Sequence, residues 1–442
     1  MAEIGLFERD VRLRMPFRFG VVTLTESPQA LARVRIRMEN GREAEGAAAE
    51  LLAPKWFDKD PALSNEDNYE QLRRSLAAAR EAYLAHEGRP AWGHASPGAG
   101  LVQNYGPALL DRAALDALCR TLGVSFYQAV RSNLMGAPGF EGIDLGAFFA
   151  TLSPAQKVAA RHTVGLVDPI TAAEQRQRVN DGLPETLEEV IARYGHRYFK
   201  LKVGGDARAD VERLAAIADV LDRIDGPYHV SLDGNEQYED MRGVAELWAR
   251  MKGEVRLARL VASVLFIEQP VKRQKALASK VEGIDKPVII DESDDALDAF
   301  PRAKALGYRG VSSKTCKGIY KSLVNRARCA AWGEGYFMSG EDLTIQPGLA
   351  LQQDLALASI LGLTHVERNG HHYVNGMASL PQAEQDAFLA AHPDLYQRSH
   401  GAVRVRILDG MLAIGSLDCP GYASRAMPDW KSMREMTWAS VS

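Results

Sequence analysis

The chain has 442 residues and a net charge of −4; 46% of its residues are hydrophobic and 25% are charged. This composition is that of an ordinary globular protein and excludes a disordered, collagen-like or coiled-coil chain. The charge balance offers no positive field for a polyanion, so we expect no nucleic-acid partner. The four cysteines form no CxxC pair, and the sequence shows neither a signal-peptide core nor an apolar run of about 18 residues. We therefore expect a cytoplasmic protein that does not act at a membrane.

The first part of the chain predicts a small α+β domain. Strand-like runs cover about 3–14, 31–38 and 44–52, with a turn at Asn40-Gly41 between the last two. Helix-forming residues dominate about 66–87, and two more helical segments within 106–135 are separated at Gly123.

From about His162, short runs rich in β-branched and aromatic residues alternate with amphipathic helical stretches, which predicts a parallel sheet. The eight runs are 163–166, 198–203, 229–232, 263–267, 287–290, 310–313, 336–338 and 364–366. Their spacing favours a closed (β/α)8 barrel, with an open doubly wound sheet as the competitor. We favour the barrel because polar residues recur at the C-terminal end of nearly every run. After about residue 375, a hairpin is predicted from 403–407 and 411–414 around Asp409-Gly410.

Three consecutive runs end in a carboxylate: Asp233, Glu268 and Asp291. Each alone is most simply a solvated loop residue or a helix N-cap. At the mouth of a barrel, however, the three would repel one another unless a divalent cation held them. Oxygen ligands without a nearby Cys-His set favour Mg²⁺ over zinc. The sequence therefore predicts a magnesium site on these three acids.

Lysines flank the acids in strand order. Lys200 and Lys202 lie on one strand as Lys-x-Lys and share a face, and Lys314 ends the sixth run. Lys202 and Lys314 would then lie on opposite sides of a bound carboxylate, where one could remove an α-proton. A second ammonium at Lys200 would lower the pKa of the base. A lone lysine in a strand is otherwise an exposed edge residue or a salt-bridge partner.

Other polar residues near the strand ends are weaker candidates for substrate or ligand contact. Asn235 follows Asp233 and Glu292 follows Asp291, and both could equally be loop hydrogen bonders; Lys317 is expected to be solvated or to support another residue. The ends of the last two runs contribute Glu341, Asp342, Glu367, Arg368, His371 and His372. The adjacent histidines lack the i, i+4 spacing of a helical metal pair, so we expect no zinc site from them.

The linked motifs resemble those of the enolase superfamily, in the subgroup of muconate lactonizing enzymes and dipeptide epimerases (mandelate racemase/muconate lactonizing enzyme family). They are Phe199-Lys200-Leu201-Lys202-Val203-Gly204, Leu232-Asp233-Gly234-Asn235, Phe266-Ile267-Glu268-Gln269-Pro270, Ile290-Asp291-Glu292-Ser293 and Ser313-Lys314. The resemblance implies an α/β fold: a modified (β/α)7β TIM barrel over about 155–375, with an α+β capping domain over 1–140 that the C-terminal segment 376–442 completes. It also implies Mg²⁺ on Asp233, Glu268 and Asp291, with Lys202 and Lys314 as the acid/base pair.

Departures from the family pattern bear on the substrate. The eighth run ends Val366-Glu367-Arg368, without the Asp-x-Asp that binds the ammonium of dipeptides in the epimerases. In order along the chain, Arg18 and Trp56 fall in the family's specificity loops and would suit an acyl or anionic tail.

We expect a racemase or epimerase of an amino-acid derivative or related small-molecule carboxylate, acting as a homo-oligomer. The alternatives are β-elimination (dehydratase, o-succinylbenzoate synthase-like), cycloisomerisation and a non-catalytic protein on the same scaffold.

Overall fold

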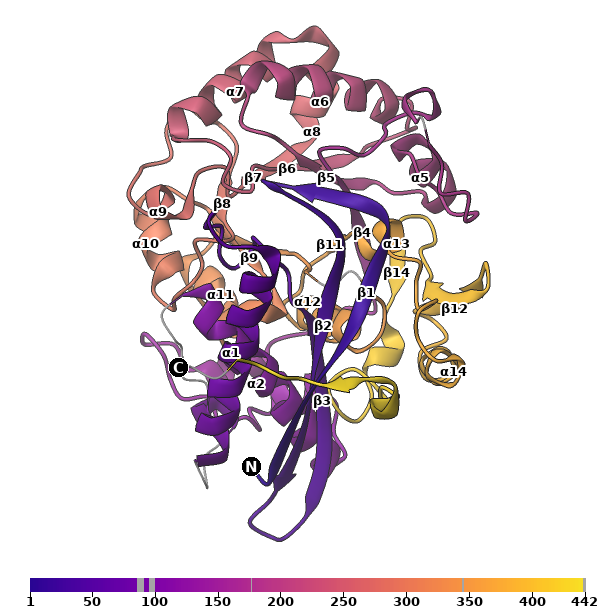
Figure 1. The fold of residues 1–442 in the computed structure, drawn as a ribbon. Coiled ribbons are helices and arrows are strands. Elements are labelled where there is room, and N and C mark those ends of the chain that lie inside the picture. Colours follow the sequence, from indigo (N-terminus) through magenta and orange to yellow (C-terminus); the bar gives the residue numbers. More distant parts are fainter. Residues whose placement is uncertain (86–90, 95–99, 176, 344–345, 440–442) are drawn as a thin grey trace.

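The structure is a computed structural model that describes residues 1–85, 91–94, 100–175, 177–343 and 346–439. It has two main parts, a long antiparallel sheet with two helices and a barrel of parallel strands (Figure 1). Within the described ranges, every helix is too short or too polar to span a bilayer.

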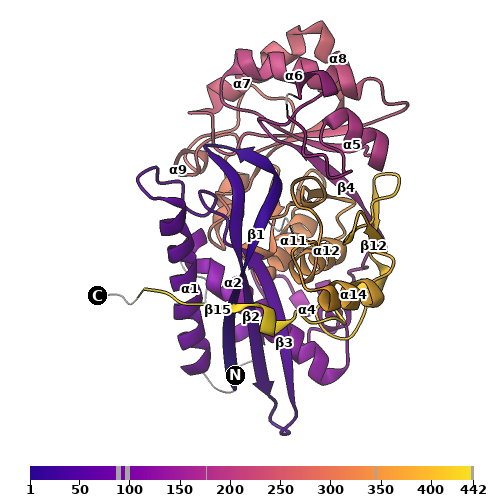
Figure 2. The same cartoon turned by 45° about the vertical axis from the view of Figure 1, so that its right-hand side comes forward.

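The capping domain is built from an antiparallel sheet in the order β15-β1-β2-β3. Its strands are β1 (Glu3–Phe19), β2 (Val22–Arg37), β3 (Glu43–Leu51) and β15 (Arg434–Glu435), and its long helices are α1 (Asn65–Ala85) and α2 (Leu101–Leu122). Gly46 of β3 lets α2 approach closely, because a Cβ atom there would lie 2.2 Å from the backbone nitrogen of Ala117. In the view turned by 45°, the long strands of this sheet run alongside the barrel (Figure 2).

Eight parallel strands form the barrel, which closes where β11 pairs with β4. The strands are β4 (Lys157–Val164), β5 (Tyr198–Lys202), β6 (His229–Asp233), β7 (Val264–Glu268), β8 (Val288–Ile290), β9 (Gly310–Ser313), β10 (Phe337–Gly340) and β11 (His365–Arg368). The helices that connect them are α5 (Leu187–Tyr194), α6 (Ala207–Leu221), α7 (Met241–Gly253), α8 (Ala258–Ser263), α9 (Arg273–Ala276), α10 (Ala299–Ala305), α11 (Ile319–Trp332) and α12 (Leu349–Ile360). The predicted barrel with a capping domain is therefore confirmed.

The remaining elements are short. The helices are α3 (Phe126–Arg131), α4 (Leu145–Ala150), α13 (Gly370–Tyr373) and α14 (Gln382–Ala391), and the strands are β12 (Tyr396–Ser399), β13 (Ala402–Val405) and β14 (Met411–Ala413). The 3₁₀ helices are η1 (Ala91–His94), η2 (Ala172–Glu174), η3 (Val255–Leu257), η4 (Thr315–Lys317), η5 (Gly415–Leu417) and η6 (Trp430–Ser432).

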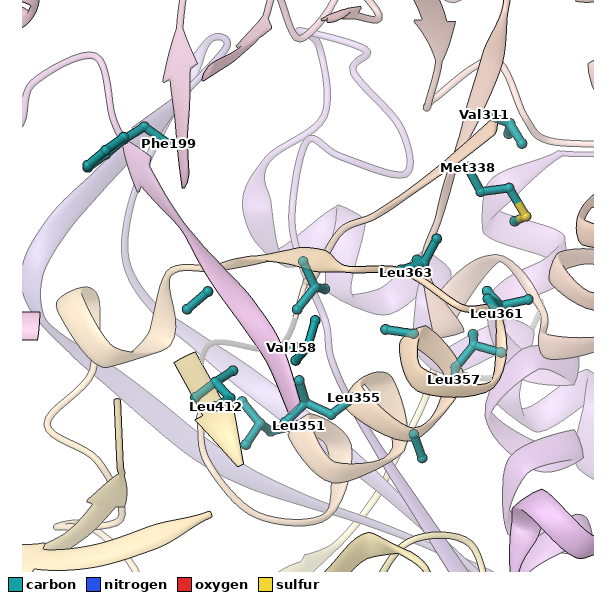
Figure 3. Close-up of a cluster of buried hydrophobic side chains, with 14 of the residues drawn as sticks. Val158, Phe199, Val311, Met338, Leu351, Leu355, Leu357, Leu361, Leu363 and Leu412 are labelled. Atoms are coloured by element: carbon teal, nitrogen blue, oxygen red, sulfur yellow. The ribbon is translucent and has the colours of Figure 1, made fainter. Parts of the chain in front are cut away.

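Apolar side chains between the barrel strands and their helices form one large core. Figure 3 shows part of it, where Val158 of β4, Leu351 and Leu355 of α12 and Leu412 of β14 come together. Leu412 is the register partner of Val158, so β14 seals the start of β4. Burial of this kind contributes about 25 cal/mol per Å² of apolar surface and fixes the strands that carry the site.

The C-terminal segment differs in part from its prediction. The predicted turn at Asp409-Gly410 forms, with Leu408 and Met411 bridged across it. The longer pairing of 403–407 with 411–414 is wrong, because β13 pairs with β12 and β14 pairs with β4. The reason is an open edge of β4: β5 pairs with it only from Arg161 onward, which leaves the stretch at Lys157–Ala159 for β14. Farther on, β15 pairs with β1, so the segment completes the capping sheet. The exact domain boundaries stay a prediction.

Candidate active site

The three predicted acids lie at the C-terminal ends of neighbouring barrel strands. Asp233 ends β6, Glu268 ends β7 and Asp291 directly follows β8, and each side chain is at most 1% exposed. Asp233 and Glu268 are register partners in the barrel. The structure therefore brings all three carboxylates together at one mouth of the barrel, as the sequence predicts.

The chain turns sharply directly after two of these acids. Asn235 and Gln269 have positive φ angles of 39° and 31°, a conformation that side chains other than glycine rarely adopt. Between Asp233 and Asn235, a Cβ on Gly234 would lie 2.5 Å from the Cα of Pro270, so this position accepts only glycine without a backbone shift. Such strained backbone persists when the surrounding structure holds it, and it is concentrated at functional sites.

Gln269 ties the end of β7 to the end of β8. Its Oε1 accepts hydrogen bonds from the backbone nitrogens of Asp291 (2.8 Å) and Ser293 (3.1 Å). Its Nε2 donates to the Val271 carbonyl and to Ser293 Oγ, both at 2.8 Å. The amide therefore fixes Asp291 relative to Glu268. Gln269 belongs to the motif Phe266-Ile267-Glu268-Gln269-Pro270, but no local pattern in the sequence predicts this role.

Lys200 lies at the centre of the acidic cluster. Its Nζ is 2.9 Å from Asp233 Oδ2 and 2.8 Å from Glu268 Oε2. It also reaches Glu341 Oε2 at 2.5 Å and Glu367 Oε2 at 3.1 Å. Burial alone would lower the pKa of Lys200, but these four carboxylates raise it well above its usual value. Lys200 is therefore charged in this arrangement and compensates part of the buried negative charge.

Lys202 and Lys314 flank the acids from opposite sides of the barrel mouth. Lys202 lies on β5, before the acid-bearing strands β6, β7 and β8 in the barrel order, and Lys314 follows β9, beyond them. Lys202 Nζ lies 2.6 Å from Asp233 Oδ2 and donates to Asn235 Oδ1 at 2.7 Å. Lys314 Nζ lies 2.5 Å from Asp291 Oδ2 and 3.9 Å from Glu268 Oε1. Both side chains are buried and line the same cavity.

The acids differ in charge preference because their neighbours differ. Burial opposes ionisation of Asp291, but Lys314 and Lys317 hold its pKa below the usual range. Burial and the neighbouring Glu341 raise the pKa of Glu268 well above its usual value. Of the three acids, Glu268 is therefore the one whose surroundings disfavour its ionised form.

The capping domain covers the site with residues from β1, β2 and the loop after β3. Phe17, Phe19, Leu24 and Trp56 line the cavity together with the barrel lysines. Lys59 of the same loop reaches across to Glu236 Oε2 at 2.5 Å and Glu292 Oε1 at 3.1 Å. Lys59 was not predicted from the sequence. A lysine in a polar loop is ordinarily exposed, and the residues around it do not indicate that it pairs with Glu236 of the barrel.

The weaker candidates separate into those inside the cavity and those outside it. Asn235, Asp342, Glu367 and Trp56 line it. Glu292 is buried and paired with Lys59, whereas Arg18 has an exposed side chain and is not among the described residues that line the cavity. Lys317 is 3% exposed and lies 3.1 Å from Asp291 Oδ1, so it supports an acid, and the solvated alternative is wrong.

The donor set fits a hard divalent cation. Asp233, Glu268 and Asp291 offer buried carboxylate oxygens, the ligand type that Mg²⁺ prefers. Both oxygens of Glu268 lie within an ion-pair distance of a lysine but accept no hydrogen bond of good geometry from the residues that the structure describes. Buried oxygens without donors are costly, and a cation would satisfy them.

Comparison with known proteins agrees with this geometry. The sequence model of the enolase C-terminal domain-like family matches residues 182–416, more than half of the chain. The chain belongs to the enolase superfamily. No curated protein sequence matches it.

Solved structures with the same fold include enzymes of several kinds. The dipeptide epimerase from Enterococcus faecalis, complexed with Mg and a dipeptide, is 15% identical with a TM-score of 0.62, covering 96% of this chain and 99% of the other. The N-succinyl Arg/Lys racemase from Bacillus cereus is 16% identical with a TM-score of 0.61, covering 96% and 95%. The 2-chloromuconate cycloisomerase from Rhodococcus opacus is 16% identical with a TM-score of 0.61, covering 96% of both chains. As a member of this superfamily, the protein is an enzyme of the isomerase or lyase type.

Proposed function

We propose that this superfamily member is a Mg²⁺-dependent enzyme that abstracts the proton α to a carboxylate, and that it racemises or epimerises an amino-acid derivative or a related carboxylate. The observation that carries the proposal is the strand order at the barrel mouth. Lys202 on β5 and Lys314 after β9 lie on either side of the three acid-bearing strands, and both line one cavity.

Asp233, Glu268 and Asp291 would hold the cation. When bound, Mg²⁺ would supply positive charge that stabilises the negative charge that develops as the α-proton leaves. Lys202 and Lys314 act on the α-carbon from opposite sides: one neutral amine takes the α-proton and becomes an ammonium, and the other ammonium returns a proton to the opposite face. The two transfers together conserve protons and invert the centre.

The roles of the remaining side chains follow from their contacts. Asn235 accepts from Lys202 Nζ at 2.7 Å and orients this amine toward the cavity. Lys200, with carboxylates on every side, acts as a charge that holds the cluster together and does not exchange protons with substrate. Gln269 positions Asp291 for the cation.

The cavity wall bears on the substrate. The capping domain contributes apolar side chains, Phe17, Phe19, Leu24 and Leu51, opposite the charged barrel mouth. The cations Arg18 and Lys59, which could bind an anionic tail, are respectively exposed and paired with acids. This wall favours a substrate with an apolar acyl group or side chain next to its carboxylate.

A second candidate is β-elimination or cycloisomerisation on the same scaffold. The observation that favours it is the position of Lys314, whose Nζ lies 5.0 Å from the centroid of the Trp56 ring. An aromatic face stabilises an ammonium ion over a neutral amine. Lys314 would then stabilise developing negative charge while Lys202 alone moves the proton. A cytoplasmic location stays a prediction from the sequence, and a homo-oligomeric state stays an expectation from the family resemblance.

The experiment is deuterium exchange at the α-carbon in D₂O, followed by NMR. The protein is incubated with Mg²⁺ and pools of N-acylamino acids, dipeptides, hydroxy acids and lactones. We expect exchange in at least one pool member with an apolar tail, loss of exchange with EDTA, and loss with Glu268→Gln. The matched control is the exposed Glu282→Gln, which should exchange like the wild type. Exchange that persists in Glu268→Gln with EDTA would overturn the proposal.

A further inference from the structure

Three histidines converge on the outer side of the barrel wall, away from the acidic mouth. His162 lies on β4, His196 lies just before β5 and is separated from it by Arg197, and His371 lies in α13 after β11. His371 Nε2 is 3.2 Å from His162 Nδ1 and 3.3 Å from His196 Nε2. All three ligand atoms lie within 4.8 Å of one another. His162 and His196 are 1% exposed.

The alternation of β4 separates this cluster from the candidate active site. Arg161 and Thr163, on either side of His162, point into the barrel, where they contact Glu341 and Glu367. His162 must therefore face outward, because successive side chains of a strand point to opposite faces. The three imidazoles are thus on the other side of the β4 wall from the carboxylates and take no part in the proposed proton transfer.

Protons alone cannot satisfy the contacts among these rings. His196 Nδ1 lies 2.9 Å from the Ala160 carbonyl and must donate to it, which leaves His196 Nε2 as a lone pair. His371 Nε2 faces this lone pair and also His162 Nδ1. If His371 Nε2 carries a proton, it can donate to only one of these two nitrogens. If it carries a lone pair instead, this lone pair repels the lone pair on His196 Nε2.

A metal ion resolves this arrangement. A tetrahedral ion with metal–nitrogen distances of 2.0–2.1 Å places its ligand nitrogens about 3.3 Å apart. The N···N distances from His371 Nε2 to His162 Nδ1 and to His196 Nε2, 3.2 and 3.3 Å, match this edge. The bond from His196 Nδ1 to a backbone carbonyl is the usual support of a metal-bound imidazole, because it fixes the tautomer and aims Nε2 at the ion.

The surroundings suit a dication held by neutral ligands. His162 and His196 are buried, and burial disfavours the charged form of an imidazole. Arg368 and Arg14 are neighbouring cations of His371. Arg368 Nη1 is paired with Asp342 Oδ2 at 3.0 Å, and Arg14 donates to the His372 carbonyl at 2.8 Å. The charge of Arg14 is balanced by Asp181, which it contacts at 2.5 and 2.7 Å. Tyr194 packs against His196 and His371 with ring centroids 5.7 and 5.2 Å apart.

We propose that His162, His196 and His371 form a second metal site, which binds Zn²⁺ or a similar nitrogen-preferring transition-metal ion with water in the fourth position. The site lies at the seam where the barrel closes, since His162 is the register partner of Arg368 on β11. It also anchors α13, whose Tyr373 stacks on Phe17 of the capping domain with centroids 4.2 Å apart. The ion is structural: it joins β4, the start of β5 and the segment that supports the cap. Sequence reasoning considered the adjacent pair His371 and His372, and missed the two partners that the fold supplies.

The test uses tag-free full-length protein stripped of metal and then saturated with Mg²⁺, so that the carboxylate site is occupied. Zn²⁺ is titrated by calorimetry, and Co²⁺ by its visible absorption, which is intense for tetrahedral nitrogen ligands and weak for octahedral oxygen ligands. We expect one equivalent of each ion to bind, an intense Co²⁺ spectrum, and a higher melting temperature with Zn²⁺. His371→Gln and His196→Gln should weaken Zn²⁺ binding at least tenfold and abolish the intense spectrum.

Two controls keep the outcome clear. His229→Gln, a half-buried histidine at the start of β6, should bind Zn²⁺ like the wild type. Asp233→Asn should retain the intense Co²⁺ spectrum, which separates this site from the acidic one. If His196→Gln does not fold, the less buried His371→Gln decides. A wild type without the intense spectrum, or a spectrum unchanged in both histidine variants, would overturn the proposal.

Discussion

Lys314 Nζ lies 5.0 Å from the centroid of the Trp56 ring, so a lysine at the barrel mouth is covered by an aromatic side chain of the capping domain. The Trp56 carbonyl in turn accepts a hydrogen bond at 2.9 Å from Arg273, which follows β7. The loop after β3 is therefore held on the barrel by its backbone while its side chain closes the cavity. The two parts of the chain build the candidate site together.

Trp56→Ala is expected to lower kcat/KM about tenfold or more, because a cation–π contact contributes roughly 0.5–2 kcal/mol and its loss also opens the cavity to water. Trp56→Phe, which keeps an aromatic face, should lose less. The measurement is steady-state kinetics with far-UV circular dichroism as a check on the fold. The matched control is Trp332→Phe, because Trp332 packs near Lys304 on the outside of the barrel. An unchanged kcat/KM in a folded Trp56→Ala would contradict this role.

Gln269→Leu should weaken Mg²⁺ binding about 10- to 100-fold, the usual effect of removing a group that orients a metal ligand. It should also destabilise the protein by about 2–3 kcal/mol, because the backbone nitrogens of Asp291 and Ser293 lose their acceptor. Calorimetric Mg²⁺ titration and urea unfolding measure the two effects. The exposed Gln382→Leu should change neither. Wild-type Mg²⁺ affinity in Gln269→Leu would show that this amide does not position Asp291.

Lys200→Met should destabilise the metal-free protein by about 3–5 kcal/mol, since it leaves several buried carboxylates without their common cation. Mg²⁺ should restore part of this loss, and more than it adds to the wild type. Thermal unfolding with Mg²⁺ and with EDTA checks both statements. Lys280→Met, at an exposed position, is the control. Equal Mg²⁺ effects on Lys200→Met and the wild type would count against a shared acidic site.

Asp111 gives the capping domain a pH-dependent stability. Burial raises the pKa of Asp111 to about 7, from 3.8, although Tyr83 donates a hydrogen bond to it at 2.6 Å. The folded protein therefore keeps a proton that the unfolded chain has lost, so the free energy of unfolding falls as pH rises from about 4 to about 7 and then levels off. Asp111→Asn should remove this component, which is of the order of a few kcal/mol. Urea unfolding of both proteins at pH 5.5 and 8 measures it; parallel pH dependences would contradict the assignment.

The barrel was predictable because its strands are short apolar runs with sharp ends. The structure places β5, β6, β7 and β9 within one or two residues of the predicted runs. β4 was predicted too short, at 163–166 instead of Lys157–Val164. The reason is that Arg161 and His162 make its middle polar: one pairs with Glu341 inside the barrel and the other joins the histidines outside. In the capping domain, the first half of β2 was missed because Glu26-Ser27-Pro28 resembles a turn.

Site residues were predictable from the sequence where their position at the end of a strand is enough to bring them to the barrel mouth. Asp233, Glu268, Asp291 and the lysines follow this rule. Lys59 and Gln269 do not, because their partners come from other strands and from the other domain. The exposed position of Arg18 depends on how the β1–β2 hairpin lies over the barrel, which no local pattern records.

The measurement that tests the central claim most directly is deuterium exchange of the separate enantiomers of a substrate found in the pools, with Lys202→Ala and Lys314→Ala. If the two lysines act on opposite faces, each variant should lose interconversion of the enantiomers but retain exchange of one of them, and the two variants should retain opposite ones. The matched control is Lys286→Ala, which should behave like the wild type. Interconversion at the wild-type rate in either variant, or retention of the same enantiomer's exchange by both, would contradict the account.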